Sequence, residues 1–317
     1  MPPTSEAAAN PSVPIAVDAG RLHYKATRNL KERAIELLLF AAAFSAVATT
    51  VAIVYILVYE SISFFRHVSI VDFLTDTVWT PLFSNPRYGI LPLVSATLTV
   101  AGVALAIAIP MGTIVAIYLS EFAPFWVREA VKPFLELLEA VPTVVFGYFA
   151  LLFVTPLLQR IYPDLPGFNM LAAGIVIGIF IIPYISSVAE DAMRAVPMSM
   201  REGSYAMGAT RFQTAVRVVT PAAISGIVAA YILAISRAIG ETMVVAIAAG
   251  LQPNLTFNPT DQGATITAYI VQVALGDLPH GSIGYQSIFA AGLTLVLMTL
   301  GFNVLGHLLR KRFREVY

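Results

Sequence analysis

The chain consists of long uncharged stretches separated by shorter segments that carry most of its charged residues. A helix needs about 20 mainly apolar residues to cross the hydrocarbon core of a membrane. The apolar stretches are long and continuous, which is typical of membrane helices. We predict an all-α, polytopic membrane protein with six transmembrane helices, at residues 36–59, 90–119, 134–158, 168–190, 221–249 and 286–309.

Smaller features refine this division of the chain. Gly174 and Gly178 lie four residues apart in the fourth predicted helix, a spacing that favours close contact with another helix. Residues 1–35 are expected to form a cytoplasmic tail, disordered over its proline-rich first 20 residues and then a basic helix on the membrane lipid surface. The transmembrane domain would span 36–309, and residues 310–317 would be a basic C-terminal tail.

The basic residues are distributed unevenly between the connections. Lys and Arg are concentrated in the N-terminal tail, the second and fourth connections and the C-terminus, whereas the long fifth connection has none. Loops rich in Lys and Arg stay in the cytoplasm. We therefore expect a multi-pass membrane protein with both termini in the cytoplasm.

The composition supports a membrane protein and excludes several other classes. Of the 317 residues, 58% are hydrophobic and 12% are charged, and the mean hydropathy is +0.79. Soluble domains carry about 25% charged residues, so an ordinary cytosolic enzyme is excluded. The net charge of zero gives no general attraction for nucleic acid. The chain has no cysteine, and its four histidines are isolated, so we expect no metal or other cofactor.

The connection at residues 190–220 is long and polar, with a helical pattern. Pro197 is expected to begin a new element, with Ser199 as N-cap and Glu202 completing a capping box. Small residues such as Ala206, Gly208 and Ala209 would let another backbone approach closely. Physical reasoning alone leaves two alternatives, a helix that docks on a partner or an inert surface connector.

The residues of this connection resemble the EAA loop of ABC importer permeases. They are Glu202-Gly203-Ser204, Gly208 and Val218-Val219-Thr220-Pro221, with the spacing of that loop kept. Gly203-Ser204 replaces the usual Ala-Ala, Val218 replaces Ile and Thr220 replaces Leu. The resemblance implies a type I importer (MetI-like) fold and a coupling helix at 199–211 that docks on an ATP-binding subunit. Its expected docking residues are Glu202, Gly203, Ser204, Tyr205, Ala206, Met207, Gly208, Ala209, Thr210 and Arg211.

A second resemblance points to the kind of importer. The segment Arg237–Met243 reads RAIGETM and is similar to phosphate-specific transport permeases, as are Tyr88–Pro92, Leu119–Pro124 and Ala140–Gly147. Similarity covers nearly all of 88–317, and Met243 resembles the C-type subunit. The resemblance implies a homologous A-type permease, two ATP-binding subunits and an extracytoplasmic phosphate-binding protein as partners. It also implies a location in a bacterial inner membrane.

This chain lacks the GxxxxGK[ST] loop that binds nucleotide phosphates. ATP and Mg²⁺ would therefore act on separate subunits. The chain itself is expected to be a non-catalytic membrane subunit.

Arg237 is the strongest candidate for contact with a transported anion. An ionisable residue inside a membrane helix is costly unless it is paired or faces water. Glu241 follows four residues later and is expected to share its face and partly neutralise it. The arginine fork suits phosphate oxygens, and Glu241 could accept a hydrogen bond from protonated phosphate. The alternative is that the two residues form a structural pair. Ser236 and Thr143 are weaker candidates for pathway donors.

Three other functions are alternatives to phosphate import. An importer for another oxyanion, such as sulfate or molybdate, would share this architecture, and substrate competition would separate the two. An ion-driven secondary transporter would show inverted repeats and broken midplane helices, and it would leave the coupling loop unexplained. An intramembrane enzyme would need a motif such as HExxH or GxSxG, and the sequence contains neither.

Overall fold

The structure is a computed structural model that describes residues 19–83, 85–276 and 278–312. It is helical, and within these ranges the β-structure is one isolated antiparallel bridge between Trp79 and Tyr88. The chain divides into two units, Met1–Ile56 and Leu57–Tyr317. The predicted disordered segment lies mostly outside the described residues, as does the end of the C-terminal tail (313–317).

Helix α1 (Ala19–Phe65) is one continuous helix of 47 residues. It joins the predicted basic helix at 21–35 to the first predicted span without a break. The apolar side chains of residues 35–56 are exposed, for example Leu37 and Phe44. Exposed apolar residues over this length are expected where a helix faces lipid or another membrane subunit.

The second unit begins inside α1 and contains the remaining elements, including three short π-helical turns labelled η. They are α2 (Ile70–Thr75), α3 (Leu91–Ile117), η1 (Tyr118–Phe122), α4 (Phe125–Ala140), α5 (Thr143–Phe149), η2 (Ala150–Val154), α6 (Thr155–Gln159), α7 (Met170–Arg194), α8 (Met198–Ala206), α9 (Arg211–Thr214), η3 (Ala215–Val219), α10 (Thr220–Ala222), α11 (Ile224–Gly240), α12 (Met243–Ala248), α13 (Ile266–Ala274) and α14 (Ile283–Arg312).

Among the residues that the structure describes, four helices are long and apolar enough to cross a membrane unbroken, and they confirm the first, second, fourth and sixth predicted spans. They are Lys31–Phe65, Leu91–Phe122, Met170–Arg194 and Ile283–Leu308. Two further spans are bent pairs, Phe125–Ala140 with Thr143–Gln159 at 87° and Arg211–Ala222 with Ile224–Gly240 at 72°. Counting each bent pair as one span gives the six that the sequence predicts.

The spans predicted at 134–158 and 221–249 are each interrupted, so neither is a single helix. Val141 and Pro142 are extended and end α4, because a residue before proline is disfavoured in the helical conformation. The other region bends at Ala223 and breaks again at Glu241, where α11 ends. All of these residues except Glu241 are uncharged, so a pattern of apolar residues does not reveal the interruptions.

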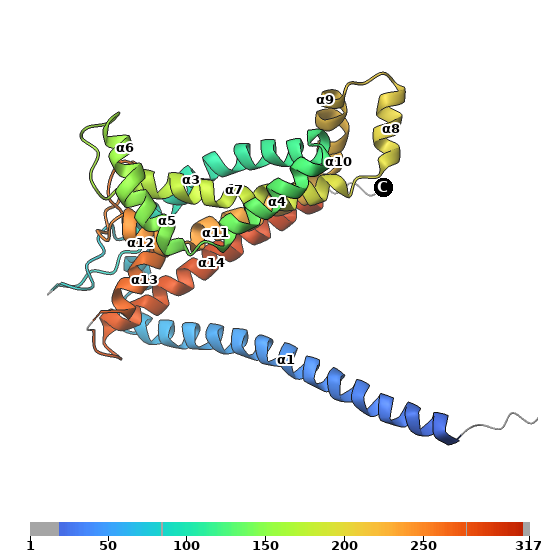
Figure 1. Ribbon diagram of the computed structural model, residues 1–317. Helices are drawn as coiled ribbons and strands as arrows, with labels where there is room; N and C mark the ends of the chain where they lie inside the picture. Colours follow the sequence, from blue (N-terminus) through green and yellow to red (C-terminus); the bar gives the residue numbers. More distant parts are fainter. Residues whose placement is uncertain (1–18, 84, 277, 313–317) are drawn as a thin grey trace, which may run out of the picture. The chain divides into compact units, whose positions relative to one another are not determined.

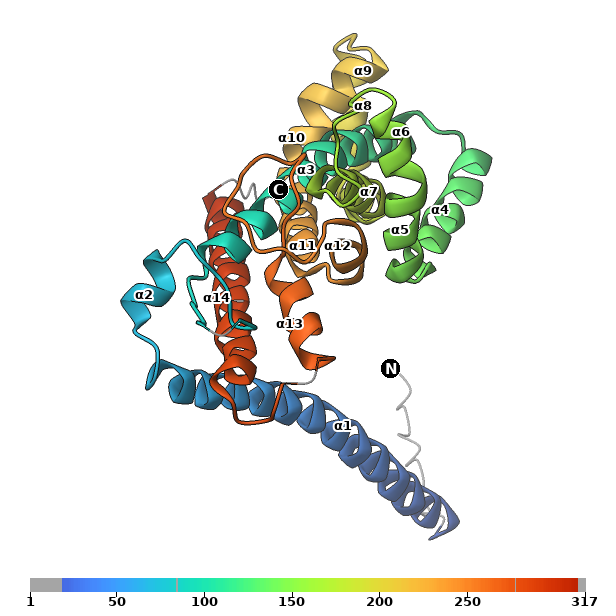
Figure 2. The same ribbon diagram turned by 90° about the vertical axis from the view of Figure 1, so that its left-hand side faces the viewer.

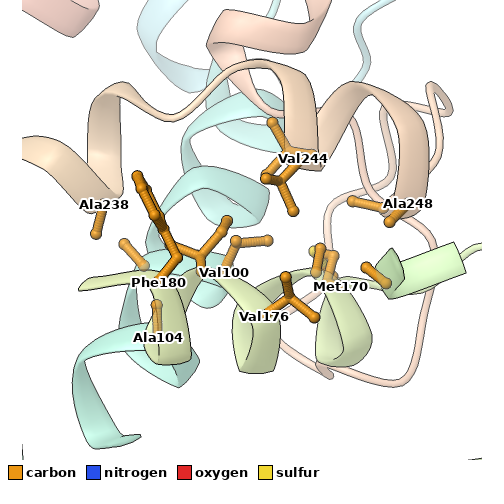
Figure 3. Close-up of a cluster of buried hydrophobic side chains, with 14 of the residues drawn as sticks. Val100, Ala104, Met170, Val176, Phe180, Ala238, Val244 and Ala248 are labelled. Atoms are coloured by element: carbon orange, nitrogen blue, oxygen red, sulfur yellow. The ribbon is translucent and has the colours of Figure 1, made fainter. Parts of the chain in front are cut away.

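The centre of the second unit is the contact between α3 and α7. A Cβ atom added at Gly178 would lie 2.8 Å from the carbonyl oxygen of Ala104, and one at Gly174 would lie 2.7 Å from Val103. The predicted close contact at these two glycines is therefore confirmed. Figure 3 shows the buried cluster around this contact, with Phe180 of α7 beside Ala104 of α3 and Ala238 of α11.

Within this unit, the functional segments lie at different ends of the central helices. Figure 1 shows α8 and α9 at one end of α3 and α7, and α12 and α13 toward the opposite end. Figure 2 shows α4 and α5 on one side of α7 and α14 on the other. Helix α7 therefore connects the region of the predicted coupling helix with the region around the helix breaks.

Candidate functional site

Arg237 lies in the last turn of α11, and its side chain is exposed in this chain. Its guanidinium carbon is 4.5 Å from the centroid of the Phe180 ring and 5.7 Å from that of Tyr184. Both rings belong to α7 and lie one turn apart. A cation over an aromatic face is stabilised by the ring quadrupole, and the C-terminal end of α11 also favours positive charge.

The guanidinium keeps its hydrogen-bonding capacity. Arginine has five N–H donors, and none of them bonds to another residue within the described ranges. Phe180 is only 2% exposed and belongs to the core, so the ring under the guanidinium is held in place. The arrangement presents a fixed positive charge with free donors, which is what an oxyanion needs.

The predicted pairing of Arg237 with Glu241 was wrong. Residues four apart share a face only while the helix continues, and α11 ends at Gly240. Glu241 has an extended backbone, and its Oε1 accepts hydrogen bonds from the backbone N–H groups of Met243 (3.2 Å) and Val244 (3.4 Å). Arg237 and Glu241 form no ion pair among the residues that the structure describes.

Glu241 instead organises the second helix break. Its carboxylate accepts from the first N–H groups of α12, which lack partners inside that helix. Its carbonyl oxygen accepts a hydrogen bond from the Thr267 hydroxyl of α13 at 2.7 Å. Glu241 is 9% exposed, so it lies between the end of α11 and the packed starts of α12 and α13.

The charge of Arg237 also acts on Glu139, in the last turn of α4, although the two side chains form no ion pair among the described residues. Glu139 is half-buried and lies three residues before the break at Pro142. The sequence did not indicate Glu139 as a candidate, because Glu139 and Arg237 are far apart in the chain. The clue was a glutamate directly before an apolar, proline-containing segment, since intramembrane charges tend to have partners.

The weaker candidates Thr143 and Ser236 occupy different positions. Thr143 is the first residue of α5, directly after the break. Ser236 donates to the carbonyl of Ile232 in its own helix (3.1 Å) and accepts from the amide of Asn303 on α14 (3.1 Å). The Ser236 hydroxyl thus helps to join α11 to α14.

The two interrupted regions come together where α5 packs on α12. A Cβ atom added at Gly147 of α5 would lie 2.9 Å from the Ile247 side chain and 3.2 Å from the carbonyl oxygen of Met243. The short helices that follow the two breaks are therefore direct neighbours. Thr143 and Glu241 lie at the starts of these two helices, and Arg237 lies one turn before the second break.

The segment predicted as a coupling helix, 199–211, covers most of α8 and only the first residue of α9. Residues 198–214, which include both short helices, are called the coupling segment below. The predicted cap at Ser199 was wrong, because Pro197 occupies the N-cap position and Ser199 lies inside α8. The capping box is instead formed by Thr210 and Gln213 at the start of α9, with bonds of 2.9 and 3.3 Å. Gly208, in the turn between the helices, has a φ of +79°, a conformation that suits glycine.

The outer side of this segment is open. Met207 is 88% exposed and Phe212 is 66% exposed. A Cβ atom added at Gly203 or at Gly208 would find no other atom within 4 Å. The Ser204 hydroxyl lies 2.9 Å from that of Thr214 and joins α8 to the residues of α9. The segment therefore presents apolar side chains and accessible backbone on a folded support.

Comparison with known proteins relates these features to a family. Residues 108–315 match the family described as binding-protein-dependent transport system inner membrane component. A probable ABC transporter permease protein of Bacillus subtilis, YqgH, is 35% identical over 287 residues, which are 90% of this chain and 93% of the relative.

Several relatives are named phosphate transport system permease protein PstC. That of Haemophilus influenzae is 31% identical over 266 residues (77% of this chain and 82% of the relative). PstC 1 of Mycobacterium tuberculosis is 33% identical over 255 residues (73% and 74%). The resemblance to C-type phosphate permeases is thus confirmed.

Solved structures show the same fold at low sequence identity. A bacterial ABC transporter that imports the acidic polysaccharide alginate covers 91% of this chain, with 100% of that chain aligned, a TM-score of 0.63 and 19% identity. The inward-facing MetNI methionine ABC transporter covers 71%, with 94% of that chain aligned, a TM-score of 0.52 and 17% identity. The predicted all-α importer fold is confirmed. The chain belongs to the family of binding-protein-dependent transport system inner membrane components and is a multi-pass permease component of an ABC importer.

Proposed function

We propose that this chain is the C-type permease subunit of an ATP-driven importer of inorganic phosphate. The proposal is supported by the relatives named as phosphate permeases, which match 73–77% of this chain at about one-third identity. Such a subunit would form half of the pathway and pair with a homologous A-type permease. An extracytoplasmic binding protein would deliver phosphate.

The observation that carries the proposal is the fixed, solvent-accessible guanidinium of Arg237. An exposed arginine in an apolar membrane segment is costly against lipid, so in the assembled transporter it would face water or a partner subunit. Its free donors suit the oxygens of phosphate. The nearby Glu139 would compete with the anion for the arginine and keep binding transient.

Glu241, Ser236 and Thr143 are proposed as further residues of the pathway around the helix breaks. Glu241 is engaged with two backbone N–H groups, yet a carboxylate has about four acceptor positions. It can therefore still accept a hydrogen bond from protonated phosphate, which sulfate at neutral pH cannot donate. Replacing Glu241 with Gln and finding the preference for phosphate over sulfate unchanged would exclude this role.

We further propose that α8 and the residues through Arg211 dock on an ATP-binding subunit. The exposed apolar side chains of this segment support such a role. Two ATP-binding subunits would grip this chain and its A-type partner, closing on ATP and switching the pathway between its two sides. ATP and Mg²⁺ would act on those subunits, and this chain would need no cofactor of its own. Both of its termini would lie in the cytoplasm.

Phosphate uptake by the reconstituted complex carrying Arg237→Ala tests the site. We expect uptake to be lost while assembly and ATP hydrolysis persist, because the substitution removes an anion contact outside the core. Arg160→Ala is a matched control, since Arg160 is an exposed arginine in the connection after α6. Retained uptake in Arg237→Ala would overturn the site, and preferred uptake of sulfate by the native complex would overturn the substrate.

A further inference from the structure

One residue of the coupling segment points away from its open surface. Arg201 lies on α8 next to Glu202 but is only 9% exposed. Its Nη2 is 2.8 Å from Oε1 of Glu121, and its Nε is 3.3 Å from Oε2 of the same carboxylate. The paired contacts form a fork between two planar groups, a geometry that fixes orientation as well as distance.

The same guanidinium also binds the end of α7. Its Nη1 donates to the carbonyl of Val196 at 2.6 Å, and its Nη2 donates to the carbonyl of Met193 at 2.9 Å. Met193 lies in the last turn of α7 and Val196 follows the end of that helix, so Arg201 joins α8 to the C-terminal end of α7. Because Glu121 belongs to η1, which directly continues α3, Arg201 joins α8 to both central helices.

A second buried ion cluster holds α4 to the same end of α7. The side chain of Glu190 is 1% exposed and lies 3.3 Å from Lys132 and 3.5 Å from Arg194. Arg128 of α4 is 4.0 Å away. This end of the unit is therefore stabilised by ion pairs in addition to apolar packing.

Closer to its N-terminus, α7 carries the two aromatic rings that lie beside Arg237, the candidate anion site. Phe180 and Tyr184, the two rings near Arg237, precede Met193 in the same helix. Phe180 lies about 20 Å from Met193 at 1.5 Å of rise per residue. A displacement applied to the end of α7 therefore reaches the rings beside Arg237 through one continuous helix.

We propose that Arg201 is a positioning residue that transmits movement of α8 to the Arg237 site through α3 and α7. The proposal rests on the proposed docking of α8 on an ATP-binding subunit. The exposed side of α8 would receive the movement, and the Arg201 fork would pass it on. Without the fork, ATP hydrolysis would move α8 with little effect on the pathway.

A purely stabilising role predicts a different behaviour. Replacing both members of a buried ion pair with apolar residues often leaves stability unchanged, whereas replacing one member leaves a buried charge. The informative variant is therefore Arg201→Met combined with Glu121→Leu. A merely structural pair would tolerate this double substitution, but a positioning residue would not.

The first test measures phosphate transported per ATP hydrolysed by the complete reconstituted complex. For the double variant we expect ATP hydrolysis within about twofold of the native rate and at least about tenfold less phosphate per ATP. Arg201→Lys, which keeps the charge but loses the fork, should give an intermediate ratio. Arg87→Met is the control, because Arg87 forms a similar fork with Asp76 in an exposed loop. An unchanged ratio in the double variant would overturn the proposal.

The second test follows the connection directly, also where the double variant transports too little to assay. The chain has no cysteine, so spin labels can be placed at Met198→Cys on α8 and Ile179→Cys on α7, both exposed positions. The label-to-label distance should be single and unchanged by ATP in the native background, and broadened or shifted in the double variant. Identical distances in both backgrounds would overturn the proposal. A native complex that moves no phosphate would instead refute the proposed function, and the distances would still test Arg201.

Discussion

The guanidinium of Arg237 lies over the ring of Phe180, with 4.5 Å between the guanidinium carbon and the ring centroid. The arginine is exposed, whereas the ring is part of the buried core. This contact attaches a charge that is accessible to solvent to the buried hydrophobic core around α3 and α7. It replaces the expected Glu241 pairing as the interaction that orients Arg237.

Replacing Phe180 with Leu should weaken phosphate binding without abolishing transport. A cation–π contact is worth about 0.5–2 kcal/mol, so the KM for phosphate uptake should rise about twofold to thirtyfold while kcat changes little. Uptake kinetics in the reconstituted complex measure both. Phe146→Leu is the control, because its ring packs 5.3 Å from that of Phe180. Equal KM values in the two variants would show that the contact with Arg237 does not matter for binding.

Glu190→Gln should destabilise the chain far more than Asp191→Asn. Gln at 190 leaves Lys132, Arg194 and Arg128 around a neutral, buried group, and loss of one partner from a buried ion pair costs about 3–5 kcal/mol. Asp191 lies closer to Lys132, at 2.9 Å, but is 64% exposed, and exposed pairs contribute about 0–1 kcal/mol. The measurement is the thermal unfolding midpoint of each variant in detergent, compared with that of the native chain. A larger fall in the unfolding midpoint for Asp191→Asn than for Glu190→Gln would contradict the assignment of Glu190 as the centre of the cluster.

Gly178→Ala should separate α3 from α7. The added methyl group would lie 2.8 Å from a backbone carbonyl oxygen, and overpacking of this kind costs about 1–3 kcal/mol. Gly102→Ala in α3 is the matched control, because a Cβ atom there meets nothing within 4 Å. It should leave stability unchanged or raise it by up to about 1 kcal/mol. The thermal unfolding temperatures of the two variants should therefore move apart, and a common shift would count against the contact.

Two glycines of the coupling segment should respond in opposite directions. Gly208 has a φ of +79°, and alanine in the left-handed conformation costs about 1–2 kcal/mol. Gly208→Ala should therefore weaken binding to the ATP-binding subunit about fivefold to thirtyfold. Gly203 is inside α8, and Gly203→Ala should hold or tighten binding through its better helix propensity. Titration of the purified ATP-binding subunit measures both, and weaker binding of Gly203→Ala alone would refute this assignment.

The sequence was sufficient for the number of spans and for one helix contact, because both depend on local composition. Long apolar segments predict spans wherever they occur, and Gly174 and Gly178 predict close packing without naming the partner helix. The breaks at Pro142 and Glu241 could not be located from hydropathy, because hydropathy does not distinguish a continuous apolar helix from a broken one. The predicted pairing of Arg237 with Glu241 was wrong for the same reason. It assumed that the helix continues from one residue to the other.

The contacts between distant parts of the chain could not be predicted from a single sequence. Arg201 and Glu121 are 80 residues apart, and neither has an unusual neighbour to mark it as buried. The capping box was assigned to Ser199 instead of Thr210 because both satisfy the same local pattern, and the left-handed Gly208 that precedes Thr210 decides between them.

The capped turn between α8 and α9 has a consequence for assembly of the transporter. Gly208, the Thr210–Gln213 capping box and the Ser204–Thr214 bond fold this segment before any partner is present. Binding to an ATP-binding subunit would then require little loss of conformational entropy, which otherwise opposes association. Complex formation should accordingly release heat and change heat capacity in proportion to the surface that is covered, without the larger signature of coupled folding.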